Sequence, residues 1–266
     1  MYLSNLLILC FVDRVLKETT IFYRDHAEIK ASHGLHHVLA VYNHALKAIA
    51  CHEPLLSACM AMEVKIAALL HDVDDKKYFP NQKVGFENAR EIMAKAQVPK
   101  HSCDTVLDMI RLVSCSSNGN QVPRHIIDGG KYYLLIPRWS DRLEAVGKVG
   151  IVRSYQYNTE HGQPLSSSQS PRARTREEIW QYAQPERFIA YQSSGGISTD
   201  MISHYYDKLL HIACPPKELI RNPYLERMAE ESSEELVELC IRFGKTGVVD
   251  THFIRDIASS LSISLP

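Results

Sequence analysis

A histidine and an aspartate stand next to each other at residues 71–72, where an apolar stretch of the chain ends, and further charged residues follow at 74–77. Burying such groups is unfavourable unless they are paired or bind a metal, and an unpaired polar group costs roughly 2–7 kcal/mol. The partners that we consider come from distant parts of the chain: His33, His37 and Asp141. We therefore hypothesise that His37, His71, Asp72 and Asp141 converge on a divalent metal ion.

Two histidines and two carboxylates suit a hard or borderline ion such as Mg²⁺, Mn²⁺, Fe²⁺ or Ni²⁺. Four protein ligands leave two octahedral positions for water and a phosphate oxygen, and metals of this kind lower the pKa of water towards ~7. His71 and Asp72 point about 100° apart on a helix, so further ligands must come from other helices. Spacing alone leaves an alternative open, because many buried histidines are only hydrogen-bonded.

Composition restricts the class of protein. The chain has 266 residues, 45% hydrophobic and 23% charged, with a net charge of −1, so a nucleic-acid or membrane partner is not expected. Seven cysteines without a C-x-x-C pair indicate a reducing compartment, and we expect a cytoplasmic protein. The apolar run 6–12 is much shorter than the ~20 residues that span a bilayer.

Hydrophobic periodicity predicts an all-α chain. Residues 132–136 fit a short strand or the start of a helix equally well. A segment rich in Ser, Pro, Gln and Arg predicts a long irregular surface loop near 158–176. The expected helices are 4–24, 36–51, 55–72, 85–96, 101–114, 139–147, a short one within 177–191, 198–211 with Ser198-Thr199 as its cap, 223–243 and 250–261.

Three segments together resemble the HD-superfamily phosphohydrolases. They are His33-Gly-Leu-His-His-Val-Leu-Ala-Val41, Leu69-Leu-His-Asp-Val-Asp-Asp-Lys-Lys77 and Ser140-Asp-Arg-Leu-Glu-Ala-Val-Gly-Lys-Val-Gly-Ile-Val-Arg153. Ile110-Arg-Leu-Val-Ser114 and Ser203-His-Tyr-Tyr-Asp-Lys-Leu-Leu210 are similar to two later parts of the small bacterial branch, which includes nucleotide pyrophosphatases. The resemblance covers roughly residues 20–240 and implies an HD-domain helical bundle.

The resemblance also implies roles for individual residues. The metal ligands would be His37, His71, Asp72 and Asp141. Asp72, Asp75 and Lys77 would be catalytic, with Asp75 orienting water or accepting its proton and Lys77 neutralising phosphate charge. The substrate-binding candidates are His33 (alternatively solvent-facing), Lys77, His204 and Lys208. Trp139 and Ser140 depart from the acidic residue and alanine that the family usually has there.

The function that the resemblance implies is metal-dependent hydrolysis of a phosphoester or phosphoanhydride in a nucleotide or other small phosphate. Two alternatives remain: a nucleotide- or metal-binding regulatory HD module with little turnover, and a phosphodiesterase acting on a cyclic or alarmone nucleotide. We expect one main domain over 25–243, preceded by a helix at 1–24 and followed by a helix and tail at 244–266.

Overall fold

The computed structural model describes residues 2–30, 33–80, 85–213 and 215–265, and the side chains from residue 10 onward apart from that of residue 116. Within these ranges every regular element is a helix and none is a strand, which confirms the predicted all-α fold. Of the apolar run 6–12, the side chains of residues 6–9 lie outside the described part of the structure.

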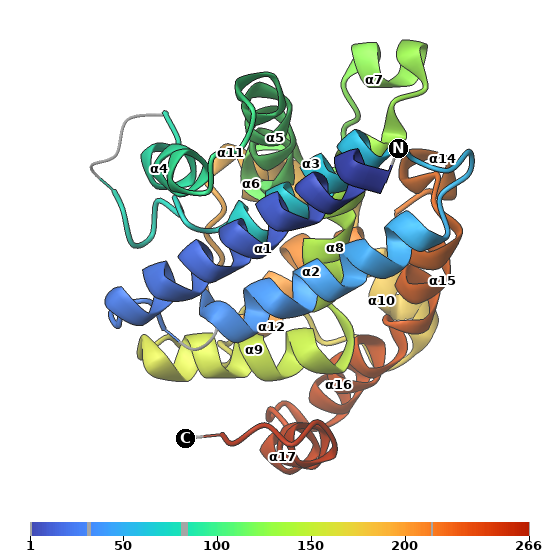
Figure 1. Cartoon of the computed structure of the whole chain (residues 1–266). Helices are drawn as coiled ribbons and strands as arrows, with labels where there is room; N and C mark the ends of the chain where they lie inside the picture. Colours follow the sequence, from blue (N-terminus) through green and yellow to red (C-terminus); the bar gives the residue numbers. More distant parts are fainter. Residues whose placement is uncertain (1, 31–32, 81–84, 214, 266) are drawn as a thin grey trace. The chain divides into compact units, whose positions relative to one another are not determined.

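The chain divides into two compact units, and neither is one continuous segment. The first unit contains residues 1–114, 122–141 and 220–225, and the second contains 115–121, 142–219 and 226–266. Figure 1 shows the course of the helices from the N-terminus to the C-terminus.

The first unit is built around helix α3 (Ala58–Leu70), which contacts α1 (Tyr2–Asp25), α2 (Leu35–Ala50) and α5 (Lys100–Val113) (Figure 1). Almost every residue of α3 from Met62 onward is buried, including Glu63. A helix that is apolar on all sides needs neighbours on all sides. The composition of α3 therefore explains its central position, and its last turn brings His71 into the interior.

Shorter helices complete the first unit: α4 (Glu87–Lys95), α7 (Arg124–Gly129) and the beginning of α8 (Ile136–Ala145). The ambiguous segment 132–136 is a 3-10 helix, Tyr132–Leu135, that leads directly into α8. The buried Arg138 of α8 donates from Nε to the carbonyl oxygen of Leu112, 2.6 Å away. This bond joins α8 to the end of α5 and holds the turn that carries Asp141.

The second unit has its own apolar core, to which α16 (Glu234–Thr246), α17 (Thr251–Ser260) and the helical residues 201–213 contribute. Its other helices are α6 (Cys115–Asn118), α9 (Gly147–Glu160), α10 (Arg176–Tyr182), α11 (Pro185–Ser193), α12 (Met201–His204), the π-helix η3 (Tyr205–Leu209), α13 (Leu210–Ala213), α14 (Lys217–Ile220) and most of α15 (Pro223–Glu231). Gly150 lies in this unit where an added Cβ would meet the Ala145 carbonyl oxygen at 2.2 Å. Its role is close packing.

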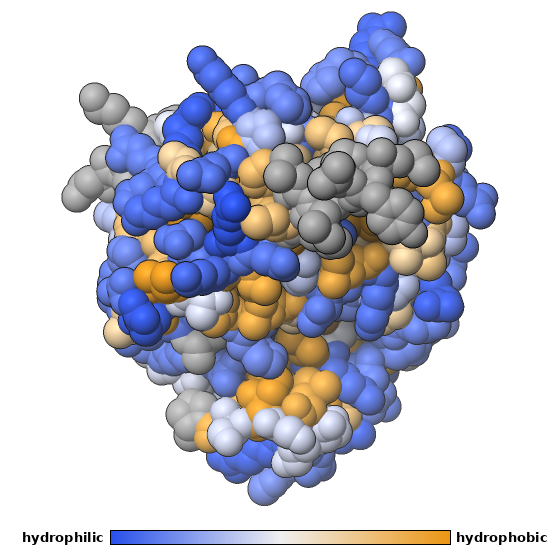
Figure 2. Space-filling model, in the orientation of Figure 1, coloured by the Kyte–Doolittle hydropathy of each residue, from blue (hydrophilic) through white to orange (hydrophobic). Residues whose placement is uncertain are grey.

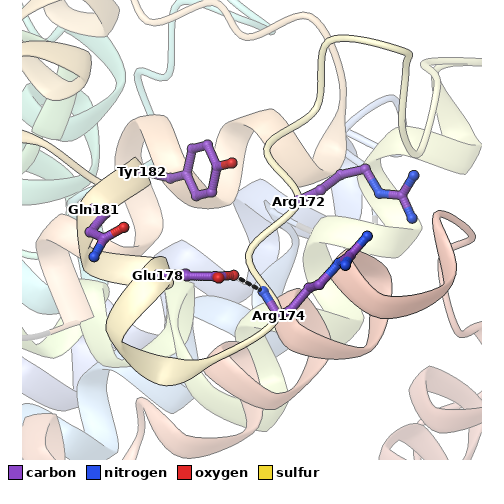
Figure 3. A pocket seen from close by; sticks show the side chains of 5 residues that line it. All are labelled: Arg172, Arg174, Glu178, Gln181 and Tyr182. Atoms are coloured by element: carbon purple, nitrogen blue, oxygen red, sulfur yellow. Dashed lines mark hydrogen bonds between the residues drawn. The ribbon is translucent and has the colours of Figure 1, made fainter.

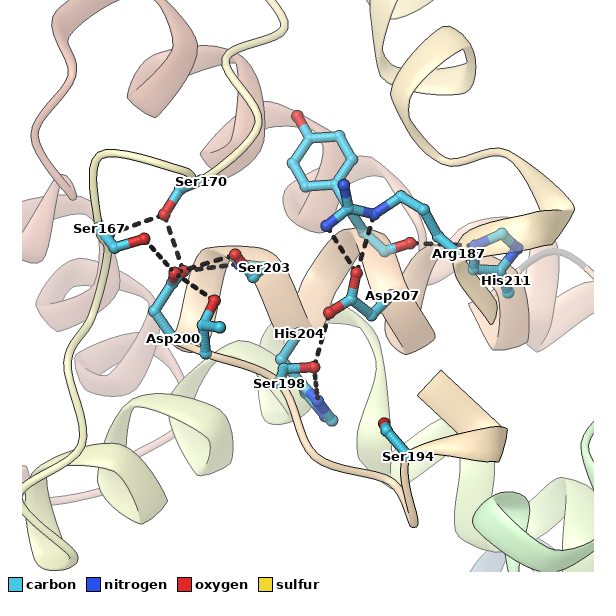
Figure 4. A network of polar contacts seen from close by, with 12 residues as sticks. Ser167, Ser170, Arg187, Ser194, Ser198, Asp200, Ser203, His204, Asp207 and His211 are labelled. Atoms are coloured by element: carbon cyan, nitrogen blue, oxygen red, sulfur yellow. Dashed lines mark hydrogen bonds and ion pairs between the residues drawn. The ribbon is translucent and has the colours of Figure 1, made fainter. Parts of the chain in front are cut away.

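The irregular segment 161–175 is only partly a surface loop, because Ser170, Pro171 and Ala173 are buried. Asp200 explains this difference from the prediction. Its buried carboxylate accepts hydrogen bonds from the hydroxyls of Ser167 and Ser170 at 2.9 Å each, and from the backbone N–H of Ser203 at 2.7 Å (Figure 4). The carboxylate thus attaches the segment to the N-terminus of α12.

The predicted cap of one helix and the predicted continuity of another were wrong. Asp200, and not Ser198 or Thr199, caps α12. The predicted helix 223–243 is interrupted at residues 232–233, where the hydroxyls of Ser232 and Ser233 donate to carbonyls of the preceding turn. Serine side chains compete in this way with the backbone bonds of a helix.

Hydrophilic residues dominate the face in Figure 2, with hydrophobic residues lying between them. Across the described part of the chain, no helix has the length and apolar character that crossing a membrane requires.

Candidate metal centre

His71 lies at the C-terminal end of α3, with its side chain fully buried. Its Nδ1 is 2.9 Å from the carbonyl oxygen of Ala68. A carbonyl can only accept, so Nδ1 carries the proton and Nε2 of the neutral ring keeps its lone pair. Hydrogen bonds of this kind commonly orient histidines that bind metals. The negative end of the α3 dipole also favours a cation nearby.

His37 comes from the first turns of α2, on the face that Val38, Val41 and Ala45 also bury. Its Nε2 lies 3.2 Å from Nε2 of His71, and the two ring planes are inclined at 75°. Because Nε2 of His71 keeps its lone pair, either a proton on His37 Nε2 or a cation between the two nitrogens completes this contact.

Asp72 and Asp141 complete a group of four. Asp72 Oδ2 lies 3.4 Å from His37 Nε2 and 3.5 Å from His71 Nε2. Asp141 Oδ1, from α8, lies 3.3 Å and 3.7 Å from the same two nitrogens. The four predicted ligands therefore converge from α2, from α3 and the turn after it, and from α8, all within the first unit.

These separations fit a metal ion. Two ligand atoms that each lie about 2.1 Å from one ion are about 3.0 Å apart at an octahedral angle and about 3.4 Å apart at a tetrahedral angle. The observed distances of 3.2–3.7 Å are close to this range. His37, His71 and Asp72 form a group that could hold a metal ion.

The centre combines buried imidazoles with accessible carboxylates. The side chains of His37 and His71 are 2% and 0% exposed, whereas those of Asp72 and Asp141 are 21% and 26% exposed. The histidines are thus fixed by packing, and the aspartates form the side that a small molecule can reach.

The electrostatics favour ionised aspartates. Burial alone would raise the pKa of Asp141, but the hydrogen bond from His37 and the charges of His71 and His37 lower it to about 2. The pKa of Asp72 is also held well below its usual range, because the same histidines outweigh the effect of burial. Acidic ligands that stay ionised at neutral pH are ready to bind a cation.

Three further predicted residues lie in the first unit on the side of Asp72. Asp75 Oδ1 accepts a hydrogen bond of 2.9 Å from the backbone N–H of Lys77, and Lys77 Nζ lies 3.0 Å from His33 Nε2. Burial, followed by repulsion from Asp72, raises the pKa of Asp75. A carboxyl group with a raised pKa and an adjacent ammonium group are suited to proton transfer and phosphate binding.

Tyr23, which was not among the predicted site residues, ends the buried stripe of α1 and is 8% exposed. Its hydroxyl is buried and makes no hydrogen bond within the described part of the chain. Burial, followed by the charges of Asp72 and Asp75, raises its pKa well above the usual value. A neutral hydroxyl beside these carboxylates can donate to a bound water or phosphate. The only sequence signal was a tyrosine among apolar residues.

The remaining two candidates, His204 and Lys208, lie in the second unit. His204 Nδ1 is 3.4 Å from the Ser198 hydroxyl, and its ring meets that of Tyr191 edge-on with centroids 5.5 Å apart. Lys208 belongs to the π-helical turn η3, so its angular offset from His204 differs from that of an α-helix. A role for either residue in substrate binding stays a prediction.

Asp74, next to Asp75 in the sequence, binds backbone groups of another helix. Its two carboxylate oxygens accept from the backbone N–H groups of Asn88 and Ala89 at 2.9 and 3.0 Å. These are unpaired donors in the first turn of α4, so Asp74 caps that helix from a distance in sequence. It thereby fixes the turn that carries Asp75.

The fold and the centre define an all-α protein with a buried His-Asp group able to hold a metal. The chain is 37% identical over 249 residues to the uncharacterized protein L803 of Acanthamoeba polyphaga mimivirus, a match that covers 88% of this chain and 97% of the viral one. It therefore belongs to the same family as L803. No family model matches the chain.

A crystal structure of a Lactobacillus plantarum protein, determined as a structural genomics target, has a similar fold. The TM-score is 0.62 at 19% sequence identity, over 90% of this chain and 98% of the other. At this identity the similarity concerns the fold alone.

Proposed function

We propose that the protein is a metal-dependent phosphohydrolase of the HD superfamily that acts on a nucleotide or another small phosphate. The observation that carries the proposal is the convergence of two buried imidazoles and two accessible carboxylates at 3.2–3.7 Å. The residues that would hold the ion are His37, His71, Asp72 and Asp141. A bound divalent ion supplies Lewis-acid chemistry, lowering the pKa of water and polarising the phosphoryl group.

The protein's own groups supply the proton transfers in this proposal. Asp72 orients the attacking water, and Asp75 accepts the proton. The raised pKa of Asp75 suits a general base, because it brings the group closer to the operating pH. Its fixed bond to the Lys77 backbone, at 2.9 Å, holds the carboxylate in place during the transfer.

The Lys77 ammonium neutralises negative charge on the phosphate, and its Nζ lies 3.0 Å from Nε2 of His33. A lysine ammonium is a compact point charge with three donors and suits a phosphate oxygen. Tyr23 adds a neutral donor that the folded protein leaves without a partner among its described residues. These groups neutralise negative charge as it develops at phosphorus.

The test is an activity screen of the purified protein with Mn²⁺ or Mg²⁺ against a nucleotide panel, with the products identified. We expect release of phosphate or pyrophosphate, and a loss of activity in His71→Ala and Asp72→Ala. His36→Ala is the matched control, because His36 neighbours His37 but is exposed. Activity that persists in both ligand variants would refute the proposal.

Two other activities give distinct outcomes in the same screen. A regulatory module is suggested by Trp139 and Ser140, which are buried at positions where the HD superfamily usually has an acidic residue and an alanine. It predicts tight nucleotide binding under saturating metal without product. A phosphodiesterase acting on a cyclic or alarmone nucleotide would open a diester and leave nucleoside triphosphates intact.

A further inference from the structure

The second unit contains an open pocket of about 400 Å³ (Figure 3). Two arginines come from the segment before α10, and the other lining residues come from α10. The lining consists of Arg172, Arg174, Glu178, Gln181 and Tyr182. None of them belongs to the candidate metal centre. Pockets of roughly 300–1,000 Å³ are typical of small-molecule sites.

The backbone between the two arginines is fixed against α16. Ala173 is fully buried, and a Cβ added to Gly244 would lie 1.7 Å from its carbonyl oxygen. Arg172 Nη2 donates to the carbonyl oxygen of Gly244 at 3.2 Å. Because Ala173 points into the core, the residues on either side of it face outward, and both arginines extend from the same short segment (Figure 3).

The turn into α10 fixes Arg174 from the other side. The backbone N–H of Arg174 donates to Glu178 Oε2 at 2.6 Å, and the Thr175 hydroxyl accepts from the Glu178 N–H at 3.2 Å. This arrangement occupies one oxygen of Glu178, the one acidic residue in the lining. The pocket therefore has two positive charges and one negative charge.

Neither guanidinium is neutralised by an ion pair with a described residue. Arg176, two positions further on, is different because it pairs with Glu234. Arginine forks match phosphate oxygens in a bidentate geometry. Two guanidinium groups on a fixed backbone, with no acidic partner among the described residues, can together bind a polyphosphate.

Tyr182 provides a surface of another kind. Its side chain is 44% exposed, and its ring rests edge-on against the buried ring of Tyr206, with centroids 6.2 Å apart. An anchored and exposed aromatic ring offers a stacking surface for a nucleic base. Gln181 adds an amide beside it that can donate and accept hydrogen bonds.

We propose that this pocket binds a nucleoside diphosphate or triphosphate, with the phosphates on Arg172 and Arg174 and the base on Tyr182. The lining has no histidine and only one carboxylate, so it binds the nucleotide without hydrolysing it. This binding needs no metal and is independent of the activity proposed for the His-Asp centre.

The test is equilibrium binding of ADP to the full chain in EDTA, which removes metal-dependent binding at the other centre. We expect ADP to bind, with Arg174→Gln weakening it by about tenfold or more, as the loss of a charged hydrogen bond implies. Arg172→Gln should have a similar effect. Arg176→Gln is the matched control and should leave binding unchanged, with melting curves confirming that each variant is folded.

Two further variants separate this pocket from nonspecific attraction. Glu178→Gln keeps an oxygen acceptor for the Arg174 N–H but removes the negative charge, so ADP should bind more tightly. Tyr182→Ala should weaken ADP and leave pyrophosphate unchanged. ADP affinity that is the same in Arg174→Gln and the wild type, or absence of binding at millimolar ADP, would overturn the proposal. Equal binding of pyrophosphate and ADP that Tyr182→Ala does not alter would overturn the assignment of the base.

Discussion

At the scale of single residues, the centre depends on how each side chain is held. The Ala68 carbonyl fixes the proton of His71 on Nδ1, and the backbone of Lys77 fixes Asp75. The first contact lies in the last turn of α3, and the second lies in the segment that follows this helix. The groups proposed for chemistry are therefore oriented before any ligand binds, which lowers the cost of forming the reactive arrangement.

Asp75→Asn should separate stability from activity. The raised pKa of Asp75 means that burial and the charge of Asp72 disfavour its ionised form in the folded protein. An asparagine keeps an oxygen for the Lys77 N–H and removes the charge, so we expect the variant to melt at a higher temperature at pH 7. Its kcat should fall by about 100-fold or more, the usual contribution of a general base. A variant with full activity would exclude Asp75 as the base.

Ser140→Ala should stabilise the protein. The Ser140 hydroxyl is fully buried and has no hydrogen-bond partner among the described residues. Removing an unsatisfied buried group avoids a cost of about 1–3 kcal/mol, and alanine is also the better helix former. We expect the free energy of unfolding in urea to rise by about 1 kcal/mol, with metal affinity unchanged. Destabilisation would mean that the hydroxyl has a partner.

At the scale of elements, α3 and the turn that follows it are held in place by different interactions. Helix α3 is fixed by burial on every side, whereas the turn at 71–79 is fixed by polar contacts to α4. The Asn88 side chain adds a bond of 2.7 Å to the carbonyl oxygen of Val73. The position of Asp75 therefore depends on how well α4 is capped.

Asp74→Ala tests this dependence. It removes both acceptors for the first turn of α4, and the loss of such a cap costs about 1 kcal/mol. Urea unfolding should show that decrease, and activity should fall as well, because Asp75 loses its support. Asp128→Ala is the control: its side chain is 67% exposed and lies 3.6 Å from Arg124 across one helical turn. It should change stability by less than about 0.5 kcal/mol.

At the scale of the whole molecule, the metal centre couples ligand binding to folding. The four ligands come from segments separated by more than 100 residues in the sequence, from His37 to Asp141. They meet only when the first unit is folded. An ion that binds this arrangement therefore stabilises the folded state relative to the unfolded chain.

Addition of Mn²⁺ should raise the melting temperature. At a concentration of 100 times Kd the gain is about 2.7 kcal/mol. The shift should disappear in Asp141→Ala and persist in His36→Ala, as differential scanning calorimetry can show. An equal shift in Asp141→Ala would mean that manganese binds elsewhere.

The metal-free protein should lose stability in acid. The pKa of Asp141 is about 2 in the folded protein, compared with 3.8 for the free group. Its ionised form therefore contributes stability, on the order of 2 kcal/mol, that is fully present above pH ~4 and is lost as the pH falls towards 2. Asp141→Asn should remove this part of the pH dependence. Unfolding monitored by circular dichroism between pH 5 and pH 2 measures the difference.

The helical class and most helix positions follow from the amino-acid sequence. Apolar residues at helical spacing bury one face, as in α2 and α5, whatever the neighbours are. The His-Asp pair at the end of α3 could also be recognised in the sequence. Burying charged groups at the end of an apolar helix is unfavourable unless they are paired or bind a metal. The break at 232–233 was not visible, since periodicity continues across the two serines that interrupt the backbone bonds.

Which polar groups face each other depends on how the helices pack. Asp74 and Asp75 are neighbours in the sequence, yet one caps α4 and the other lies beside Asp72. Tyr23 is indistinguishable from a core residue in the sequence, and its unpartnered hydroxyl appears only when α1 is packed. Local patterns in the sequence determine which helix faces are buried. Contacts between distant segments depend on how those faces pack against each other. This packing brings together His37, His71, Asp72 and Asp141.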